Sequence, residues 1–265
     1  MKLVRLRKYI KYKIKMGASK ALLFGINYVG TDAELRGCVN DVTNMGKFLR
    51  EFGGFDDIQI YTDEIDPSQV TGDAIYGHLE TLARESETGL VDRVWIHYSG
   101  HGGQVRDWSG DERDNMDECI LPVDFATKGV ITDDSIKRIL RMFHQDTKVT
   151  CVFDCCHSGT ICDLKYNYDA NMKKTSVNSF ISPCKADICV ISGCMDNQTS
   201  ADAYNVRGRH TFSGAMTSCL LDAMKYEAKS ILVFEELNKK LCYKGFEQVA
   251  QMSASRDIEF THTLY

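Results

Sequence analysis

Two short motifs carry residue types that can perform nucleophilic chemistry together. The apolar segment 94–98 is followed by Ser-Gly-His-Gly-Gly, which contains His101. The apolar segment 149–153 is followed by Asp-Cys-Cys-His-Ser-Gly, which contains Cys156. A cysteine at the end of a strand is exposed, and a neighbouring imidazole lowers the pKa of a thiol enough to make it nucleophilic. The two motifs therefore indicate a cysteine–histidine pair.

Each residue taken alone has a simpler interpretation. A single histidine is usually a satisfied structural residue, and a buried cysteine is usually an inert small apolar side chain. For His157 we favour that structural role, because its side chain should point away from that of its neighbour on an extended segment. The pair becomes the better interpretation because both motifs follow strands of one predicted sheet.

The positions of the motifs follow from an alternation of short apolar segments with helix-length segments. The predicted strands are rich in β-branched and aromatic residues and comprise 21–26, 58–61, 94–98, 149–153 and 188–191. The predicted helices comprise 38–52, 68–84, 133–143, 212–225 and 231–243. This alternation predicts an α/β fold with a mostly parallel sheet covered on both faces. Ligands bind such sheets at the carboxyl ends of the strands, where both motifs lie.

Two details extend this prediction. The helix over 38–52 has one apolar stripe, formed by Val42, Met45, Phe48, Leu49 and Phe52. Segments 102–118 and 160–185 are polar, and we predict long loops there, which in compact domains are usually functional or disordered.

The composition is that of one soluble domain. Hydrophobic residues make up 43% and charged residues 26% of the 265 residues, and three prolines leave no proline-rich linker. Because no stretch reaches about 18 uninterrupted apolar residues, we expect no transmembrane segment. No apolar segment follows the basic N-terminus, so we expect no secretory signal peptide. We divide the chain into a basic arm over 1–16 and a single domain over 17–265.

Charge is distributed unevenly between these two parts. Residues 1–16 carry seven Lys/Arg and no acidic residue, which leaves 25 basic and 37 acidic residues, a net charge of −12, in the remainder. An acidic body repels nucleic acid, so we expect no nucleic-acid partner. It attracts cationic partners, calcium or the arm itself. We consider two roles for the arm: a solvated extension, or a cover over an acidic cleft in the domain. Attachment to a membrane surface is less favoured, because the arm lacks an apolar helical face.

The cysteines do not form a recognisable disulfide or zinc framework. Their number, 11, is odd, and a chain of this length builds a core without disulfides, so we expect reduced thiols and a cytoplasmic location. Four cysteines and a histidine cluster near the second motif: Cys151, Cys155, Cys156, His157 and Cys162. We disfavour zinc there because Cys151 lies in a predicted strand and no second cysteine pair has the spacing of a zinc ribbon or finger.

The two motifs also support a family resemblance. The chain resembles the metacaspases, caspase-fold cysteine peptidases, in five segments: YSGHGG, DCCHSG, GINYVGTDAELRGCVNDV, GDERDNMDECILPVD and QVAQMSASRD. The resemblance runs from about residue 20 to the C-terminus. It implies a caspase-like three-layer sandwich, with a mostly parallel central sheet flanked by helices, and hydrolysis of peptide bonds through an acyl-enzyme. By position, His101 matches the catalytic histidine and Cys156 the nucleophile, while Cys155 occupies a variable position. Backbone N–H groups near the nucleophile and Gly102 are expected to stabilise an oxyanion.

Substrate preference follows from charge at four positions that match the family's S1 pocket: Cys38, Asp41, Ser99 and Asp154. Two carboxylates in a confined pocket require a cation, because like charges left unpaired are costly. We therefore expect Arg or Lys at the P1 position of the substrate, with Arg able to bind through two hydrogen bonds. Taken singly, Asp41 is explained as a helix N-terminal charge and Asp154 as a strand-end cap.

An acidic segment follows the histidine motif. It lacks the alternating ladder of an EF-hand, so its carboxylates either stay solvated or share a hard cation. The resemblance implies activating Ca²⁺ at positions that bind it in calcium-dependent metacaspases: Asp117, Asp133, Asp134 and Asp163.

Departures from the family define further expectations. The basic arm stands in place of the proline- and glutamine-rich prodomain of many type I members, and the long linker of type II members is missing, so we expect a compact, type I-like, monomeric enzyme. Lys173 and Lys174 form a possible self-cleavage site or a plain solvated loop. Two main rival hypotheses remain: a caspase-fold scaffold without activity, and a caspase-fold peptidase that prefers Asp or Asn at P1. A redox or zinc protein is a third, less favoured alternative.

Overall fold

The computed structural model describes residues 17–107, 115–155, 161–162, 164–177, 184–193, 202–204, 212–246, 248–259 and 262–265. These residues fold around one eight-stranded sheet. Its strands, in spatial order, are β2 (Asp57–Thr62), β1 (Ala18–Gly25), β3 (Val91–Ser99), β7 (Lys148–Asp154), β10 (Asp187–Ser192), β13 (Gln251–Ala254), β8 (Tyr166–Tyr168) and β9 (Lys174–Val177). The strands from β2 to β10 are parallel to one another, and β13, β8 and β9 continue the sheet in antiparallel pairing.

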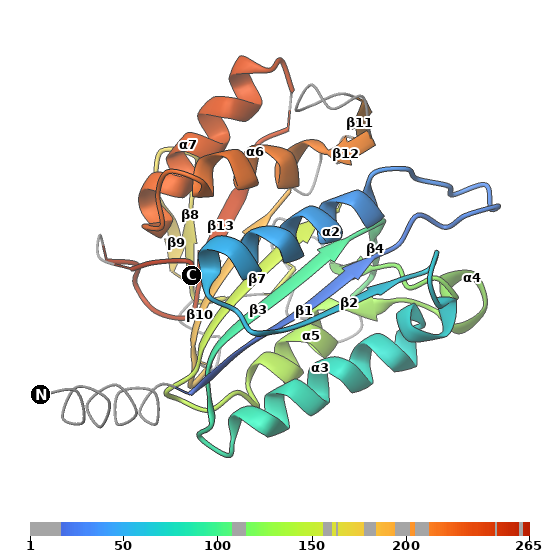
Figure 1. Cartoon of the computed structure of the whole chain (residues 1–265), viewed down its shortest axis with the longest axis horizontal. Coiled ribbons are helices and arrows are strands. Elements are labelled where there is room, and N and C mark those ends of the chain that lie inside the picture. The colour runs from blue at the N-terminus through green and yellow to red at the C-terminus, as the bar shows by residue number, and fades with distance from the viewer. Residues whose placement is uncertain are drawn as a thin grey trace, which may run out of the picture.

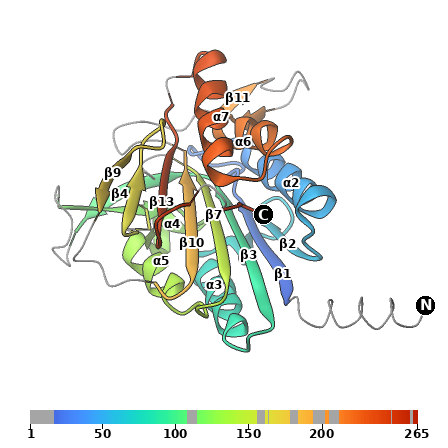
Figure 2. The same cartoon turned by 90° about the vertical axis from the view of Figure 1, so that its left-hand side faces the viewer.

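Helices cover both faces of this sheet (Figure 1 and Figure 2). One layer contains α2 (Cys38–Phe48), α6 (Ala215–Met224) and α7 (Ser230–Tyr243), and the other contains α3 (Gly72–Ser86) and α5 (Asp133–Leu140). The buried apolar residues accordingly form two cores, one on each side of the sheet. The three-layer α/β sandwich predicted from the sequence is confirmed.

Strand β3 shows why the central strands lack the polar alternation of a half-exposed strand. Val94, Ile96 and Tyr98 pack in the core beside α3 and α5, whereas Trp95 packs in the core beside α2, α6 and α7. Because successive side chains of a strand point to opposite faces, both sets must be apolar when both faces are covered. The carboxyl end of β3 is thereby fixed in a rigid layer.

The helix predicted over 38–52 is correct in its first part only. It ends as α2 at Phe48 and continues as a π-helical turn, η1 (Leu49–Gly53). Val42, Met45, Phe48 and Leu49 are buried as predicted, but Phe52 is 58% exposed. A π turn contains more residues than an α turn, which rotates Phe52 away from the stripe.

The long loops predicted over 102–118 and 160–185 contain strands, so this prediction is wrong for those parts. Strands β4 (Gly102–Arg106), β5 (Met116–Ile120) and β6 (Ile131–Thr132) form a small antiparallel sheet, and β8 and β9 extend the main sheet. Every residue of β9 is exposed. A strand without an apolar face gives no periodic signal, so only its hydrogen-bonded partner reveals it.

The remaining elements are short and mostly flank the helices. Segment 68–84 is divided into the 3₁₀-helix η2 (Pro67–Val70) and α3, and α4 (Phe125–Lys128) lies before β6. The helix predicted over 212–225 begins only at Ala215, because Phe212–Gly214 forms β12, which pairs with β11 (Asp202–Tyr204).

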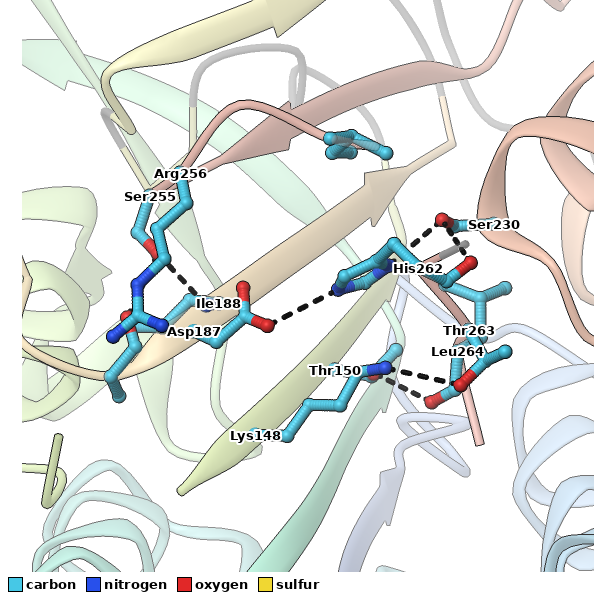
Figure 3. Close-up of polar contacts among 12 residues, drawn as sticks. Lys148, Thr150, Asp187, Ile188, Ser230, Ser255, Arg256, His262, Thr263 and Leu264 are labelled. Carbon is cyan, nitrogen blue, oxygen red and sulfur yellow. Dashed lines mark hydrogen bonds and ion pairs between the residues drawn. The ribbon is translucent and has the colours of Figure 1, made fainter. Parts of the chain in front are cut away.

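The C-terminal residues are fastened across the sheet beside α7 (Figure 3). Thr150 Oγ1 donates to Leu264 O at 2.8 Å, which ties β7 to the segment. The His262 ring bridges two elements: Nδ1 lies 2.8 Å from Ser230 Oγ, and Nε2 lies 3.6 Å from Asp187 Oδ2. We call His262, Ser230 and Asp187 the C-terminal clasp.

Two global observations complete the fold. Within the described part of the chain, no helix is both long and apolar enough to span a bilayer. None of the nine cysteines that the structure describes forms a disulfide bond, and eight of them are buried.

Candidate active site

The two sequence motifs start side by side at the carboxyl edge of the sheet. Strands β3 and β7 are neighbours, and their last residues, Ser99 and Asp154, are paired in register. The N–H of Gly100 also donates to Asp154 O at 3.4 Å. His101 comes two residues after Ser99, and Cys156 comes two residues after Asp154. Cys156 and His157 lie outside the described residues, so the contact between the two catalytic candidates stays a prediction.

The backbone of His101 is held on both sides by tyrosine hydroxyls. Its N–H donates to Tyr28 Oη at 2.9 Å. Its carbonyl accepts from the N–H of Leu121 at 3.0 Å and from Tyr98 Oη at 2.9 Å. These contacts join the end of β3 to the loop after β1 and to the residue after β5, so three segments fix the position of one histidine.

The ring of His101 has a defined tautomer in its neutral form. Nε2 lies 2.8 Å from the carbonyl oxygen of Ala33, which can only accept a hydrogen bond, so Nε2 carries the proton. Nδ1 is then the unprotonated nitrogen and can accept a proton from a thiol. The ring is tilted by 43° against Tyr28, with 4.8 Å between ring centroids. This is the arrangement that a general base needs.

Steric crowding explains why a glycine precedes His101. A Cβ atom on Gly100 would lie 2.7 Å from Tyr98 Oη and 3.0 Å from Tyr28 Oη, both closer than ordinary contact. A larger residue would therefore displace the hydroxyls that hold His101. Gly102, the predicted oxyanion donor, begins β4 and is paired with Ile120.

Three of the predicted S1 residues converge on a second feature of the same edge. Asp41 on α2 is fully buried, and its carboxylate accepts hydrogen bonds from Ser99 Oγ at 2.9 Å and from the N–H of Gly214 at 2.9–3.0 Å. Asp154 is 4% exposed, and its Oδ2 accepts from the N–H of Thr217 at 2.9 Å. Both carboxylates are thus bonded to the start of α6, where the helix dipole favours negative charge.

Gly214 lies between these two carboxylates. A Cβ atom there would overlap Asp154 Oδ2 and would lie 2.7 Å from Asp41 Oδ2. Only glycine therefore allows the two side chains to approach each other from different elements. The fourth predicted S1 residue, Cys38, begins α2, is 6% exposed, and has its N–H bonded to Asn27 Oδ1 at 3.1 Å.

His97, on β3, contacts the residue that bonds Asp154. His97 is fully buried, and its Nε2 lies 3.2 Å from Oγ1 of Thr217, the residue whose N–H bonds Asp154. Burial lowers the pKa of His97 from 6.5 to about 3, so this ring is neutral. Its Nδ1 has no hydrogen-bond partner among the described residues.

The structure describes three of the four residues expected to bind calcium. Asp117 lies on β5 and is 7% exposed, while Asp133 begins α5 and is 1% exposed. Strands β5 and β6 are paired so that Cys119 lies opposite Thr132, which brings Asp117 and Asp133 toward the thiol of Cys119. Burial raises the pKa of Cys119 to about 12, and the charges of Asp133, Glu118 and Asp117 add to this effect.

The structure says less about the other two predicted calcium ligands, Asp134 and Asp163. The N–H of Asp134 donates to Asp133 Oδ1 at 2.8 Å, and Asp163 lies outside the described residues. Within the described ranges, no group of three or more His, Cys, Asp or Glu side chains is arranged to hold a metal ion.

Sequence reasoning missed four contributors to this site: Tyr28, Tyr98, Gly214 and Thr217. Tyr28 lies inside a motif used for the family resemblance, and Tyr98 is the residue before Ser99 in YSGHGG, so proximity along the chain could have suggested both. Gly214 gave no signal, because it bonds a carboxylate 173 residues away.

Comparisons with known proteins identify the family of this chain. Residues 19–165 match the family model described as "Metacaspase, peptidase C14 domain". Metacaspase-2 of Trypanosoma brucei brucei is 37% identical over 268 residues, covering 92% of this chain and 75% of that protein. Metacaspase-1 of Saccharomyces cerevisiae is 33% identical, covering 94% and 69%.

Solved structures agree on the fold. A protein from Geobacter sulfurreducens superposes with a TM-score of 0.64 at 24% identity, covering 91% of this chain and 95% of that one. Caspase-1 from Spodoptera frugiperda superposes with a TM-score of 0.53 at 13% identity, covering 89% and 86%. The fold is therefore that of caspases, and the sequence relatives narrow it further. The chain belongs to the metacaspase family and is a cysteine-type peptidase that acts on proteins.

Proposed function

We propose that this metacaspase is an endopeptidase that cleaves after Arg or Lys, using Cys156 and His101, and that calcium stimulates it. One observation carries the specificity: the carboxylates of Asp41 and Asp154 meet on either side of Gly214, at the sheet edge that bears His101. Like charges so close together favour a cationic partner. An aspartate side chain at P1 would be repelled there.

The chemistry follows from the tautomer of His101. Nδ1 of His101 takes the thiol proton of Cys156, and the sulfur attacks the carbonyl carbon of the scissile peptide bond. The tetrahedral oxyanion is stabilised by backbone N–H groups near Cys156 and Gly102. The C–N bond then breaks as His101 returns its proton to the leaving amine, leaving a thioester. Water, deprotonated by His101, hydrolyses the thioester and restores the thiol.

The proposed S1 carboxylates also bear on the choice between the two basic side chains. A guanidinium group matches two carboxylates with paired, charge-assisted hydrogen bonds, whereas an ammonium group interacts as a point charge. We therefore expect Arg to be preferred over Lys at P1.

The calcium proposal rests on the chemistry of the donor set. Asp117, Asp133, Asp134 and Asp163 would hold the ion through carboxylate oxygens, the ligands that Ca²⁺ prefers. A bound cation would neutralise the buried charges at Asp117 and Asp133. Asp163 follows Cys156 closely in the chain, which is why we propose that the ion affects activity.

Four further proposals accompany this function. The enzyme is a monomer in the cytoplasm, and its basic arm covers the acidic cleft. Self-cleavage occurs after Lys173 or Lys174. Lys174 begins β9 and pairs with Asp257 at 2.5 Å, while Asp169 bonds the backbone of Lys173 through both its N–H and its carboxylate. Cleavage there requires the β8–β9 hairpin to open.

A library of fluorogenic peptides that differ only at P1 tests the proposal, with and without millimolar calcium. We expect cleavage after Arg and Lys, a higher rate with calcium, and no cleavage by Cys156→Ala. Cleavage after Asp or Asn that survives Asp154→Ala would favour the peptidase of different specificity. No cleavage of any peptide, with Cys156→Ala indistinguishable from the parent, would favour the inactive scaffold.

A further inference from the structure

Tyr28 has a backbone conformation that its side chain disfavours. Its φ angle is +51°, in the left-handed region, where bulky residues other than glycine are genuine outliers. Two other non-glycine residues described here share a positive φ, Asn115 and Met172. Tyr28 differs from both because it is 1% exposed, so surrounding atoms fix its conformation. Strain that a structure maintains at one buried residue invites a functional explanation.

A neighbouring carboxylate maintains this conformation. Asp63 is 8% exposed, and its two oxygens accept hydrogen bonds from the residues on either side of Tyr28: Asn27 N–H at 2.9 Å and Val29 N–H at 3.4 Å. Thr31 adds two bonds to the carbonyl of Tyr28, from its N–H at 3.2 Å and from Oγ1 at 2.8 Å. The turn is therefore built around Tyr28.

The strained backbone directs the phenol ring toward the catalytic histidine. Tyr28 Oη donates to Leu121 O at 2.5 Å and accepts from the N–H of His101 at 2.9 Å. The same ring lies against the imidazole, with 4.8 Å between centroids. Burial raises the pKa of Tyr28 well above its ordinary value, so the hydroxyl stays a neutral donor. One side chain thus contacts both the backbone and the ring of His101.

Tyr98 provides the natural comparison. Its hydroxyl also lies in this network, 3.0 Å from Tyr28 Oη and 2.9 Å from His101 O. Tyr98, however, is part of regular strand β3 and packs in the core, so its place follows from the sheet. Tyr28 needs a strained turn and a dedicated carboxylate to reach the same point.

We propose that Tyr28 is a positioning residue for catalysis: held in its strained turn by Asp63, it fixes His101 so that Nδ1 faces the thiol of Cys156. This inference rests on the proposed role of His101 as general base. Tyr28 does not touch the reacting atoms, and it acts only through His101. Loss of its hydroxyl leaves the His101 N–H without that acceptor and frees the histidine to shift.

The first measurement is the steady-state kinetics of Tyr28→Phe in the full chain with an Arg-coumarin peptide. We expect kcat to fall roughly 10- to 100-fold, because small displacements of catalytic groups lower rates by such factors. KM should stay within about twofold of the parent value. Asp63→Asn, which weakens the bonds beside Tyr28, should show the same pattern to a smaller degree. Tyr61→Phe is the matched control, because the Tyr61 hydroxyl donates to Gln59 on the same strand, β2, and its loss should leave kcat unchanged.

The second measurement is the rate at which iodoacetamide alkylates Cys156, followed by mass spectrometry of the peptide that contains it. This rate reports the histidine–thiol pair without any peptide substrate, so a mistaken P1 preference cannot affect it. We expect Tyr28→Phe to slow alkylation toward the rate of His101→Ala. The inference is overturned if folded Tyr28→Phe has the alkylation rate and kcat of the parent while His101→Ala is alkylated slowly. It is also overturned if Tyr28→Phe changes only thermal stability and KM.

Discussion

Two neighbouring regions at the carboxyl edge of β3 are held together by different kinds of contact. The histidine region consists of His101, Tyr28, Tyr98 and Ala33, and its contacts join neutral hydroxyl, carbonyl and N–H groups. The carboxylate region consists of Asp41, Asp154, Ser99, Gly214 and Thr217, and its contacts join two acidic groups to Ser99 at the end of β3 and to donors at the start of α6.

This difference fits the separate tasks that we propose for the two regions. Neutral contacts fix the geometry of one nitrogen without adding a charge beside it. Carboxylates bonded to a helix N-terminus are held in place and keep their affinity for a cation. Changes in the histidine region should therefore alter the rate of the chemical step, and changes in the carboxylate region should alter the choice and binding of substrate.

Asp154→Asn should have the largest effect and should act on substrate binding. The substitution keeps the shape and removes one of the two charges, and a desolvated charge pair at an interface is worth about 2–5 kcal/mol. We expect kcat/KM for an Arg peptide to fall about 30-fold or more, mainly through KM, while the relative disfavour of an Asp peptide diminishes. Equal losses for Arg and Asp peptides would contradict the assignment of this region to specificity.

Gly100→Ala should have the next largest effect and should act on rate. The added methyl group would press on the hydroxyls of Tyr98 and Tyr28, 2.7 and 3.0 Å away. We expect kcat to fall roughly tenfold or more, since misplacement of a catalytic group costs up to about 100-fold, with an unchanged ratio of Arg to Lys cleavage. Steady-state kinetics on both peptides checks this. A changed ratio with normal kcat would show that the two regions are not separate.

His97→Gln should change how stability depends on pH. The folded protein keeps His97 neutral down to about pH 3, whereas the unfolded chain binds a proton below pH 6.5. The free energy of unfolding therefore falls as pH drops from 6.5 to 3, by about 1.4 kcal/mol per pH unit from this group.

Urea unfolding between pH 7 and pH 4 measures this effect. The His97→Gln variant should lose the contribution of about one proton to the pH dependence of the free energy of unfolding. Parallel curves for the parent and His97→Gln would disprove the prediction.

His262→Gln, in the C-terminal clasp, should have the smallest effect. Interaction with the His262 ring holds the pKa of the Asp187 carboxyl below its ordinary value of 3.8. A lowered pKa contributes stability that is present above pH 3.8 and is lost as pH falls through the folded-state value. The pair is partly exposed, so we expect less than about 1 kcal/mol and unchanged kcat. Melting temperatures at pH 5 and pH 3 check this, since the difference from the parent should shrink at the lower pH.

Much of the fold could be predicted from the sequence because the central strands are buried on both faces. Trp95 and Ile96 must both be apolar under two layers of helices, and that requirement is visible in five-residue segments. Strand β9 could not be predicted, because all its residues are exposed and its place depends on β8. Phe52 was placed wrongly because nothing in the local pattern signals a π turn.

The site was predictable to the extent that its residues stand beside strand ends. His101 and Asp154 directly follow or end apolar segments, so the topology of a parallel sheet brings them to one edge. The contact of Asp41 with Gly214 spans 173 residues, and the conformation of Tyr28 depends on Asp63. Contacts of this kind depend on tertiary packing and leave no local pattern.

The most direct test of the account is whether the thiol of Cys156 and the ring of His101 lie within reach of each other. Dibromoacetone, a short reagent with two alkylating carbons, links a cysteine to a histidine only when both are a few ångströms apart. Mass spectrometry of the digested protein should show the peptide of Cys156 joined to the peptide of His101, and this product should vanish in His101→Gln. Linkage of Cys156 to His157 alone, or single alkylation of Cys156 with no link to His101, would contradict the account.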